Sequence, residues 1–295
     1  MTHKEFLVLS TITTAPAPLT QRAVAAQTGM SVGSVNEAVS NLTEQGLVAD
    51  RHITDEGLDA LEPYRVKRAV LIAAGFGSRM VPITLNTPKP LVRVGGKRII
   101  DTILDAVYAA GITEVYVVRG YLGEQFDQLL YKYPTIKLID NPLYNEANNI
   151  SSMVAAKDYL QSAYVFESDL LLRNPSLITR YQDRSNYLGI PMERSDDWCF
   201  EVKNGVIKDL GIGGEGGVWQ MVGVSYWTPE DGKKLAEDIP ATFAMPGGKE
   251  RFWDEAPLKY FADKYKVYAR ECSLSDVTEI DSFRELEAID PAYDC

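Results

Sequence analysis

A glycine turn followed by two spaced cations is the part of this sequence most suited to chemistry. An apolar run at residues 69–74 predicts a buried strand, and it stops at Gly75-Phe76-Gly77-Ser78-Arg79. Ten residues after Arg79, Lys89 stands between two prolines. A glycine turn that leaves a strand lets backbone N–H groups come close to a phosphate. Because Arg79 and Lys89 would add positive charge where a polyphosphate lies, the pattern suggests chemistry on a nucleoside triphosphate.

The elements that must position these residues alternate between strand and helix from Val66 onward. This alternation predicts an α/β fold with a mainly parallel sheet and helices on both faces. Ligands bind at the carboxyl ends of the strands in such sheets, so the acidic strand end Glu167-Ser168-Asp169 is a second candidate for the site. The expected strands are residues 69–74, 114–118, 136–140 and 164–166, and the expected helices are residues 99–110, 126–131 and 149–159.

Residues 1–64 predict a separate small domain with a winged helix-turn-helix layout. Thr20 and Ser31 are suited to cap its second and third helices, and a short strand pair is expected within residues 47–53. DNA binding through the third helix is disfavoured by charge, because residues 1–66 hold four basic and eight acidic residues. Residues 31–45 contain no Lys or Arg. A packing, dimerisation or regulatory role is therefore favoured for this domain.

Composition narrows the function classes further. The chain has 295 residues and a formal net charge of −11, which argues against broad binding to nucleic acid or an anionic membrane. Its two histidines, His3 and His52, both precede the first predicted strand of the larger domain, so histidine acid–base chemistry is not available from residues 66–295 themselves. The sequence shows no signal peptide, membrane-spanning run or CxxC pair, so a cytoplasmic location is the expectation.

The motif around Arg79 and Lys89 resembles one known family. It lacks the third glycine of a dinucleotide-binding turn and the Gly-Lys-Ser/Thr of a Walker loop. The run Gly-x-Gly-Ser-Arg, followed by Pro-Lys-Pro-Leu, resembles the signature of nucleotidyltransferases of the sugar-phosphate and phosphocholine type. The resemblance extends over residues 66–295. It implies a doubly wound, mainly parallel, Rossmann-like nucleotidyltransferase sheet.

The resemblance also implies roles for individual residues. Arg79 and Lys89 would be catalytic, and Asp169 and Asp281 would hold Mg²⁺. Glu167 stands where the family carries the first acid of an Asp-x-Asp, so its role stays open, and Asp254 is a competing metal ligand. The resemblance implies nucleotide binding by Ala73, Ala74, Gly75, Phe76, Gly77, Ser78, Gly120, Tyr121, Asn141, Asn148, Asn149 and Ser151.

The acceptor side depends on aromatic and acidic residues in the second half of the chain. Asp197, Trp198, Trp253 and Asp254 resemble the choline-side segments of phosphocholine cytidylyltransferases and could hold an ammonium group. The expected function is an Mg²⁺-dependent cytidylyltransferase that joins CTP to phosphocholine or a related amino-alkyl phosphate or phosphonate. Three alternative functions stay open: a 2-aminoethylphosphonate cytidylyltransferase, a sugar-1-phosphate nucleotidyltransferase and a nucleotide-sensing transcriptional regulator. Assembly of the chain into a homodimer also stays open.

Overall fold

The computed structural model describes residues 1–15 and 17–293, and the chain divides into two compact units. The first contains Met1–Arg65 together with Tyr181–Asp183, and the second contains the remaining described residues. The expected division fell between residues 64 and 66, with residues 294–295 of the expected second domain lying outside the described part. The sequence did not indicate that Tyr181–Asp183 would join the first unit.

The first unit has the order of elements expected for a winged helix. Three helices begin at a cap, where a Thr or Ser hydroxyl accepts a hydrogen bond from a backbone N–H of the first turn, and two of these caps, Thr20 and Ser31, were predicted. The third of these caps is Thr54. The elements are α1 (His3–Thr14), α2 (Gln21–Thr28), α3 (Val32–Glu44), β1 (Val48–Ala49), β2 (His52–Ile53) and α4 (Asp55–Leu61).

The segment Tyr181–Asp183 completes the core of this first unit. The Tyr181 side chain is buried in the cluster that contains Phe6, Leu9 and Leu42. The backbone N–H of Gln182 donates to the carbonyl of Tyr64 at 2.9 Å. The unit is therefore built from two separated parts of the chain.

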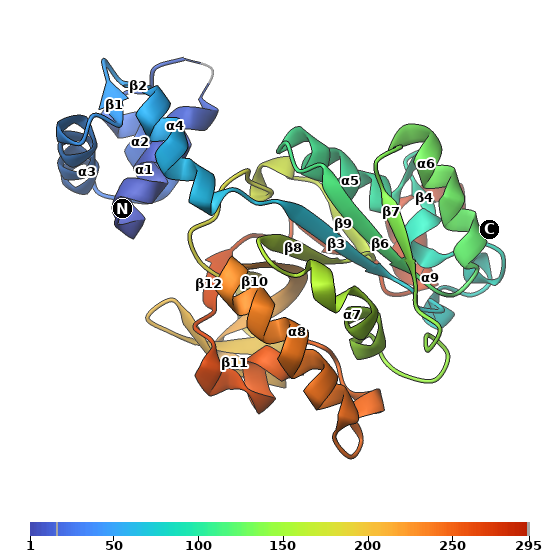
Figure 1. The fold of residues 1–295 in the computed structure, drawn as a ribbon. Helices are drawn as coiled ribbons and strands as arrows, with labels where there is room; N and C mark the ends of the chain where they lie inside the picture. The colour runs from blue at the N-terminus through green and yellow to red at the C-terminus, as the bar shows by residue number, and fades with distance from the viewer. Residues whose placement is uncertain (16, 294–295) are drawn as a thin grey trace. The chain divides into compact units, whose positions relative to one another are not determined.

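The second unit is organised around a seven-stranded sheet with the strand order β10-β12-β11-β8-β3-β6-β7 (Figure 1). The four strands expected from the sequence are present and parallel: β3 (Arg68–Ala73), β6 (Glu114–Arg119), β7 (Lys137–Asp140) and β8 (Ala163–Glu167). The sequence did not predict a long antiparallel hairpin, which pairs along β8 and makes the sheet mixed. Its strands are β10 (Asn186–Lys203) and β11 (Val206–Trp227), and β12 (Tyr268–Glu271) pairs parallel to β10.

Helices cover both faces of this sheet, as predicted. Alternate residues of β3 point to opposite faces, so Leu71 packs in the core cluster of Ile103 while Val70 packs in that of Met153. The expected helix at residues 126–131 is instead a 3₁₀ segment, Gly123–Gln128, followed by a single helical turn. The α-helices are α5 (Ile99–Ala109), α6 (Leu129–Lys132), α7 (Ile150–Ala156), α8 (Pro229–Ala244) and α9 (Phe283–Ile289).

In the described part of the second unit, two short sheets lie outside the main one, and one of them bears on the site. β9 (Leu170–Leu172) pairs antiparallel with β13 (Val277–Glu279), and Glu279 lies opposite Leu170. Asp169 directly precedes β9 and Asp281 follows β13, so antiparallel pairing brings these two residues to the same end of the small sheet. The other pair is β4 (Arg93–Val94) with β5 (Lys97–Arg98).

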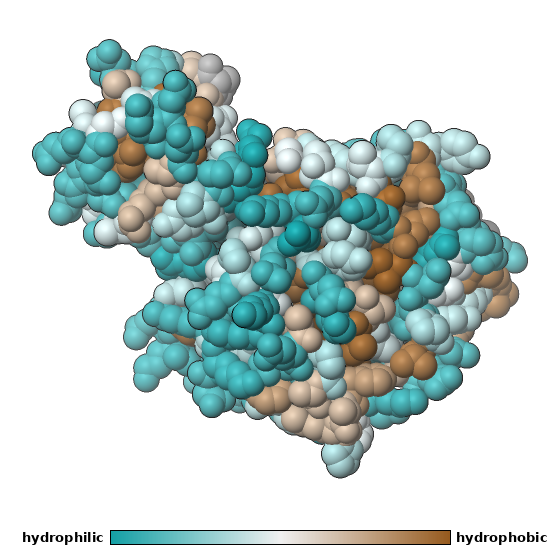
Figure 2. Space-filling model, in the orientation of Figure 1, coloured by the Kyte–Doolittle hydropathy of each residue, from teal (hydrophilic) through white to brown (hydrophobic). Residues whose placement is uncertain are grey.

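The surface drawn in Figure 2 is mostly hydrophilic, with apolar side chains in smaller areas between polar ones. Among the described residues, no helix has the length and apolar character needed to span a bilayer.

Candidate active site

A pocket of about 670 Å³ opens in the second unit beside the glycine turn. Segments far apart in sequence line it: the turn after β3, the end of β8, the β10–β11 hairpin and the chain after β13. Many of the residues expected at the site meet here. Those in the lining are Ala73, Gly75, Gly77, Ser78, Arg79, Lys89, Asn148, Asn149, Asp169, Asp197, Trp198 and Asp281.

Gly77 is required for the shape of the turn. Its φ of +61° is a conformation that residues with a side chain rarely adopt. A Cβ atom at this position would stand 3.0 Å from both the Lys89 Cβ and the Thr84 Cγ2 atoms. The Thr84 hydroxyl also donates to the Gly77 carbonyl at 2.8 Å. The turn is therefore closely packed against the aliphatic part of Lys89.

The two expected cations and the two expected metal ligands form one ionic cluster. The Lys89 Nζ atom lies 3.0 Å from both Asp169 Oδ2 and Asp281 Oδ1. Arg79 Nη2 lies 2.7 Å from the same Asp281 oxygen. Burial alone would lower the pKa of Lys89, but the adjacent carboxylates outweigh it and raise the pKa above its ordinary value. The side chain is therefore a charged ammonium at neutral pH.

Glu279 adds a third carboxylate to this cluster. Asp169, Glu279 and Asp281 each offer an oxygen within 4.8 Å of the others, a spacing and chemistry that suit a divalent cation. Asp169 Oδ1 is buried and makes no hydrogen bond within the described chain, so it is available as a ligand. Loss of solvent around its carboxylate, and then repulsion from the two aspartates, raises the pKa of Glu279, although the residue as a whole is exposed. The sequence analysis did not single out Glu279, although its place at a predicted site segment, two residues before Asp281, was a usable signal.

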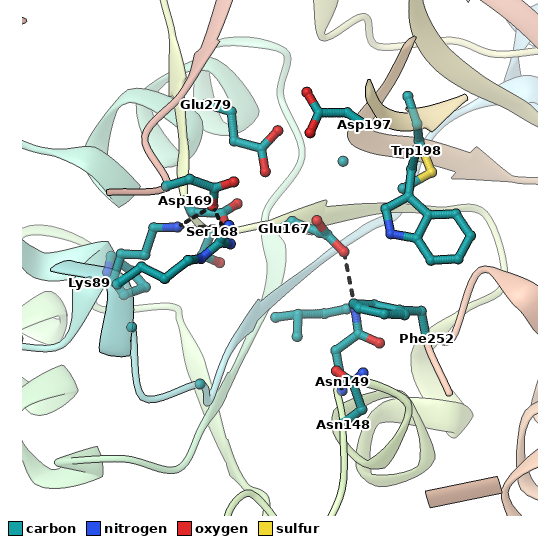
Figure 3. Close-up of a pocket in the computed structure, with 18 of the residues that line it drawn as sticks. Lys89, Asn148, Asn149, Glu167, Ser168, Asp169, Asp197, Trp198, Phe252 and Glu279 are labelled. Atoms are coloured by element: carbon teal, nitrogen blue, oxygen red, sulfur yellow. Dashed lines mark hydrogen bonds and ion pairs between the residues drawn. The ribbon is translucent and has the colours of Figure 1, made fainter. Parts of the chain in front are cut away.

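The opposite end of the pocket combines carboxylates with aromatic rings. The ring centroids of Trp198 and Phe252 lie 5.4 Å apart in an edge-to-face arrangement. Figure 3 shows these rings facing the same space as Glu167 and Asp197. Glu167 accepts a hydrogen bond from Asn149 Nδ2 at 3.1 Å. Burial, and then repulsion from Asp254 and Asp169, raises the pKa of Glu167 well above its ordinary range.

Two expected acceptor residues lie behind the pocket, which corrects their placement. Trp253 and Asp254 are each only 1% exposed, and neither lines the pocket. Trp253 packs edge-to-face against Trp227 in the core. Asp254 accepts a 2.6 Å hydrogen bond from the Tyr187 hydroxyl, and burial raises the pKa of Asp254 to about 7. Phe252, their exposed neighbour, takes the position at the pocket that the sequence reasoning gave to Trp253.

Two expected nucleotide residues are also internal. Asn141 and Ser151 are buried and bonded to each other, with Asn141 Nδ2 donating to the Ser151 hydroxyl at 2.9 Å. Asn141 Oδ1 accepts from the backbone N–H of Leu143. This network fixes the loop that ends in Asn148 and Asn149, so these two residues support the pocket without lining it.

The remaining expected nucleotide residues, Ala74, Phe76, Gly120 and Tyr121, surround the turn outside the pocket lining. The N–H of Tyr121 donates to the Ala74 carbonyl at 3.1 Å, and the Tyr121 ring lies 5.1 Å from the Phe76 ring. Gly120 has no space for a side chain, because a Cβ atom would come 2.5 Å from Tyr144. These contacts support the turn from its outer side.

A family model described as nucleotidyl transferase matches residues 68–186. The 2-aminoethylphosphonate cytidylyltransferase of Lancefieldella rimae is 36% identical to this chain, covering 76% of it and 92% of the relative. The chain belongs to the nucleotidyltransferase family. The nucleotidyltransferase fold and the enzyme class inferred from the turn motif are thereby confirmed.

Other relatives agree with this assignment. The choline-phosphate cytidylyltransferase of Streptococcus pneumoniae is 31% identical, over 75% of this nucleotidyltransferase and 97% of the relative. The solved structure of the CTP:phosphocholine cytidylyltransferase from Streptococcus pneumoniae superposes with a TM-score of 0.70, covering 76% of this chain and 99% of that one, at 31% identity. A model of the MarR family matches residues 1–56, which confirms the winged-helix assignment of the first unit.

Proposed function

We propose that this nucleotidyltransferase transfers CMP from CTP to an amino-alkyl phosphonate or phosphate, with 2-aminoethylphosphonate as the favoured acceptor. The observation that carries the proposal is that one pocket holds a phosphate-binding turn with cations at one end and carboxylates with aromatic rings at the other. The activities for which the Lancefieldella and Streptococcus relatives are named support a cytidine donor and this acceptor class.

The donor end of the pocket suits in-line transfer at the α-phosphorus. An oxygen of the acceptor attacks that phosphorus, the bond to the bridging oxygen of the β-phosphate breaks, and pyrophosphate leaves. The backbone N–H groups of the turn would bind the phosphates, and Arg79 would stabilise the departing pyrophosphate. Lys89 would contact the α-phosphate or the attacking group. The acceptor is already an anion, so the reaction needs no general base, in agreement with the absence of histidine from residues 66–295.

The carboxylate cluster is the proposed site of Mg²⁺. Asp169, Glu279 and Asp281 fit this ion because each places a carboxylate oxygen, a hard ligand, within 4.8 Å of the other two. In addition, Asp169 Oδ1 is buried and makes no hydrogen bond within the described chain. When bound, the ion would neutralise charge on the phosphates during transfer. Asp254, the competing ligand of the sequence reasoning, is not part of this cluster.

The acceptor end favours a primary ammonium over a quaternary one. A primary ammonium donates hydrogen bonds, and Glu167 and Asp197 offer carboxylate oxygens to accept them. A quaternary ammonium donates none and depends on aromatic faces, of which the lining offers Trp198 and Phe252. This aromatic pair is the observation that keeps phosphocholine as the second candidate.

Pyrophosphate release tests the proposal directly. The purified chain would be assayed with CTP, UTP, ATP and GTP against 2-aminoethylphosphonate, phosphocholine, phosphoethanolamine and hexose 1-phosphates. We expect the highest kcat/KM with CTP and 2-aminoethylphosphonate. Turnover of hexose 1-phosphates alone would refute the acceptor assignment, and the Asp169→Asn variant supplies the inactive control.

A further inference from the structure

We propose that the Lys89 ammonium acts as an internal substitute for the divalent cation, holding the carboxylate cluster closed to metal until a triphosphate binds. The inference rests on the proposed metal-dependent function. It predicts that the free enzyme binds metal weakly and that the metal enters together with the nucleotide.

The geometry places the ammonium where the cation would be. Lys89 Nζ is 3.0 Å from one oxygen of Asp169 and 3.0 Å from one oxygen of Asp281. Both oxygens belong to the residues that converge with Glu279. The Lys89 side chain is only 10% exposed, so water screens these contacts weakly. A metal ion that bound through these two oxygens would compete with the ammonium for them, and one that bound through the unpaired Asp169 Oδ1 would still be repelled by the adjacent ammonium charge.

The same side chain also reaches the phosphate turn. The methylene groups of Lys89 lie against Gly77, where a Cβ atom would come 3.0 Å from Lys89 Cβ and 3.7 Å from Lys89 Cδ. Figure 3 shows the terminal amine directed from this region toward Asp169. A phosphate seated on the turn would therefore offer the ammonium a second anionic partner within the reach of its own side-chain rotations. Moving to that partner would free the aspartate oxygens for the metal.

Metal binding in the absence of nucleotide separates this account from a simple ion pair. Mn²⁺ affinity of the metal-free full chain would be measured by calorimetry for wild type, Lys89→Met and Lys89→Arg. Lys89→Met removes the charge and keeps the length, so we expect it to bind Mn²⁺ at least tenfold more tightly, about 1.4 kcal/mol. Lys89→Arg keeps the charge and should bind like wild type. Lys97→Met, which breaks a surface ion pair with Asp105, is the matched control and should also resemble wild type.

Lys89→Met that binds Mn²⁺ no more tightly than wild type would overturn the inference. Should this variant be unfolded without metal, refolding on addition of Mn²⁺ would support it, and failure to refold would contradict it. The metal dependence of the proposed function fails separately if wild type forms product in the presence of a chelator, and CMP transfer itself fails if wild type forms no product with Mg²⁺. Wild type that needs metal, combined with unchanged Mn²⁺ affinity in Lys89→Met, removes this inference alone.

Discussion

Gly223 on β11 leaves the space that Glu167 occupies at the acceptor end of the pocket. A Cβ atom at residue 223 would stand 2.7 Å from Glu167 Cβ, 2.7 Å from Cγ and 2.9 Å from Oε2. Real Cβ atoms essentially never come closer than 3.0 Å and ordinary contacts begin at 3.4 Å, so in Gly223→Ala residue 223 and Glu167 must move apart by about 0.7 Å to reach ordinary contact. Asn149 Nδ2 donates to Glu167 Oε1 at 3.1 Å, so a displaced carboxylate would strain or lose this hydrogen bond.

The expected loss of acceptor affinity follows from the hydrogen bond that the Glu167 carboxylate would make to the acceptor. A hydrogen bond to a charged group contributes about 1.5–3 kcal/mol, which corresponds to roughly a tenfold to 150-fold change in an equilibrium constant. If Glu167 binds the ammonium of the acceptor, Gly223→Ala should raise the KM for 2-aminoethylphosphonate by this factor. The KM for CTP should stay near the wild-type value, because the three atoms nearest to a Cβ at residue 223 all belong to Glu167 and none to the phosphate turn or Lys89.

Steady-state kinetics with each substrate varied at saturating levels of the other would measure the effect. Gly211→Ala is the matched control on the same strand, since a Cβ atom there meets nothing within 4 Å. Thermal melts of both variants would confirm that they are folded. An unchanged acceptor KM in a folded Gly223→Ala variant would refute the role given to Glu167, as would an equal rise in the KM for CTP.

Three further outcomes are expected. Tyr187→Phe removes the hydroxyl that donates to buried Asp254, so it should lower the free energy of unfolding by about 1–3 kcal/mol in urea titrations. Tyr131→Phe is the control and should leave the free energy of unfolding unchanged, because this side chain is 94% exposed. Burial raises the pKa of Asp254 to about 7 from its ordinary value of 3.8. The stability that its neutral form supplies is therefore complete below pH 3.8 and lost as pH rises through 7, and thermal melts of Asp254→Asn should lack that part of the decline. Gel shifts at low salt should show no specific duplex binding, since α3 carries no Lys or Arg, and a sequence-specific complex would contradict the charge argument.

Local signals in the sequence predicted much of the fold. The caps Thr20, Ser31 and Thr54 begin helices because their side chains satisfy free N–H groups of the first turn. The four apolar runs became parallel strands because both of their faces are covered by helices. The β10–β11 hairpin was not predicted, because its glycine-rich, partly exposed residues lack a regular apolar alternation.

The sequence predicted part of the site, and it failed where the outcome depends on contacts between segments that are distant in sequence. Arg79, Lys89, Asp169 and Asp281 were expected at one site, and the structure joins them by ionic contacts. This could be predicted because the two cations lie on one compact loop and the two aspartates lie at the ends of paired strands. Residue type could not separate pocket from core, so Trp253 was assigned to the acceptor although its ring packs internally. The joining of Tyr181–Asp183 to the first unit depends on tertiary packing between separated segments, which no local pattern encodes.

The proposed reaction is CMP transfer to an amino-alkyl phosphonate at this pocket. Phosphorus NMR of the purified chain with CTP, 2-aminoethylphosphonate and Mg²⁺ should show the loss of CTP and equal amounts of pyrophosphate and a phosphonate–phosphate anhydride. Asp169→Asn should form neither product. Undiminished CTP with every amino-alkyl acceptor in a folded preparation, or the same products from Asp169→Asn, would contradict the account.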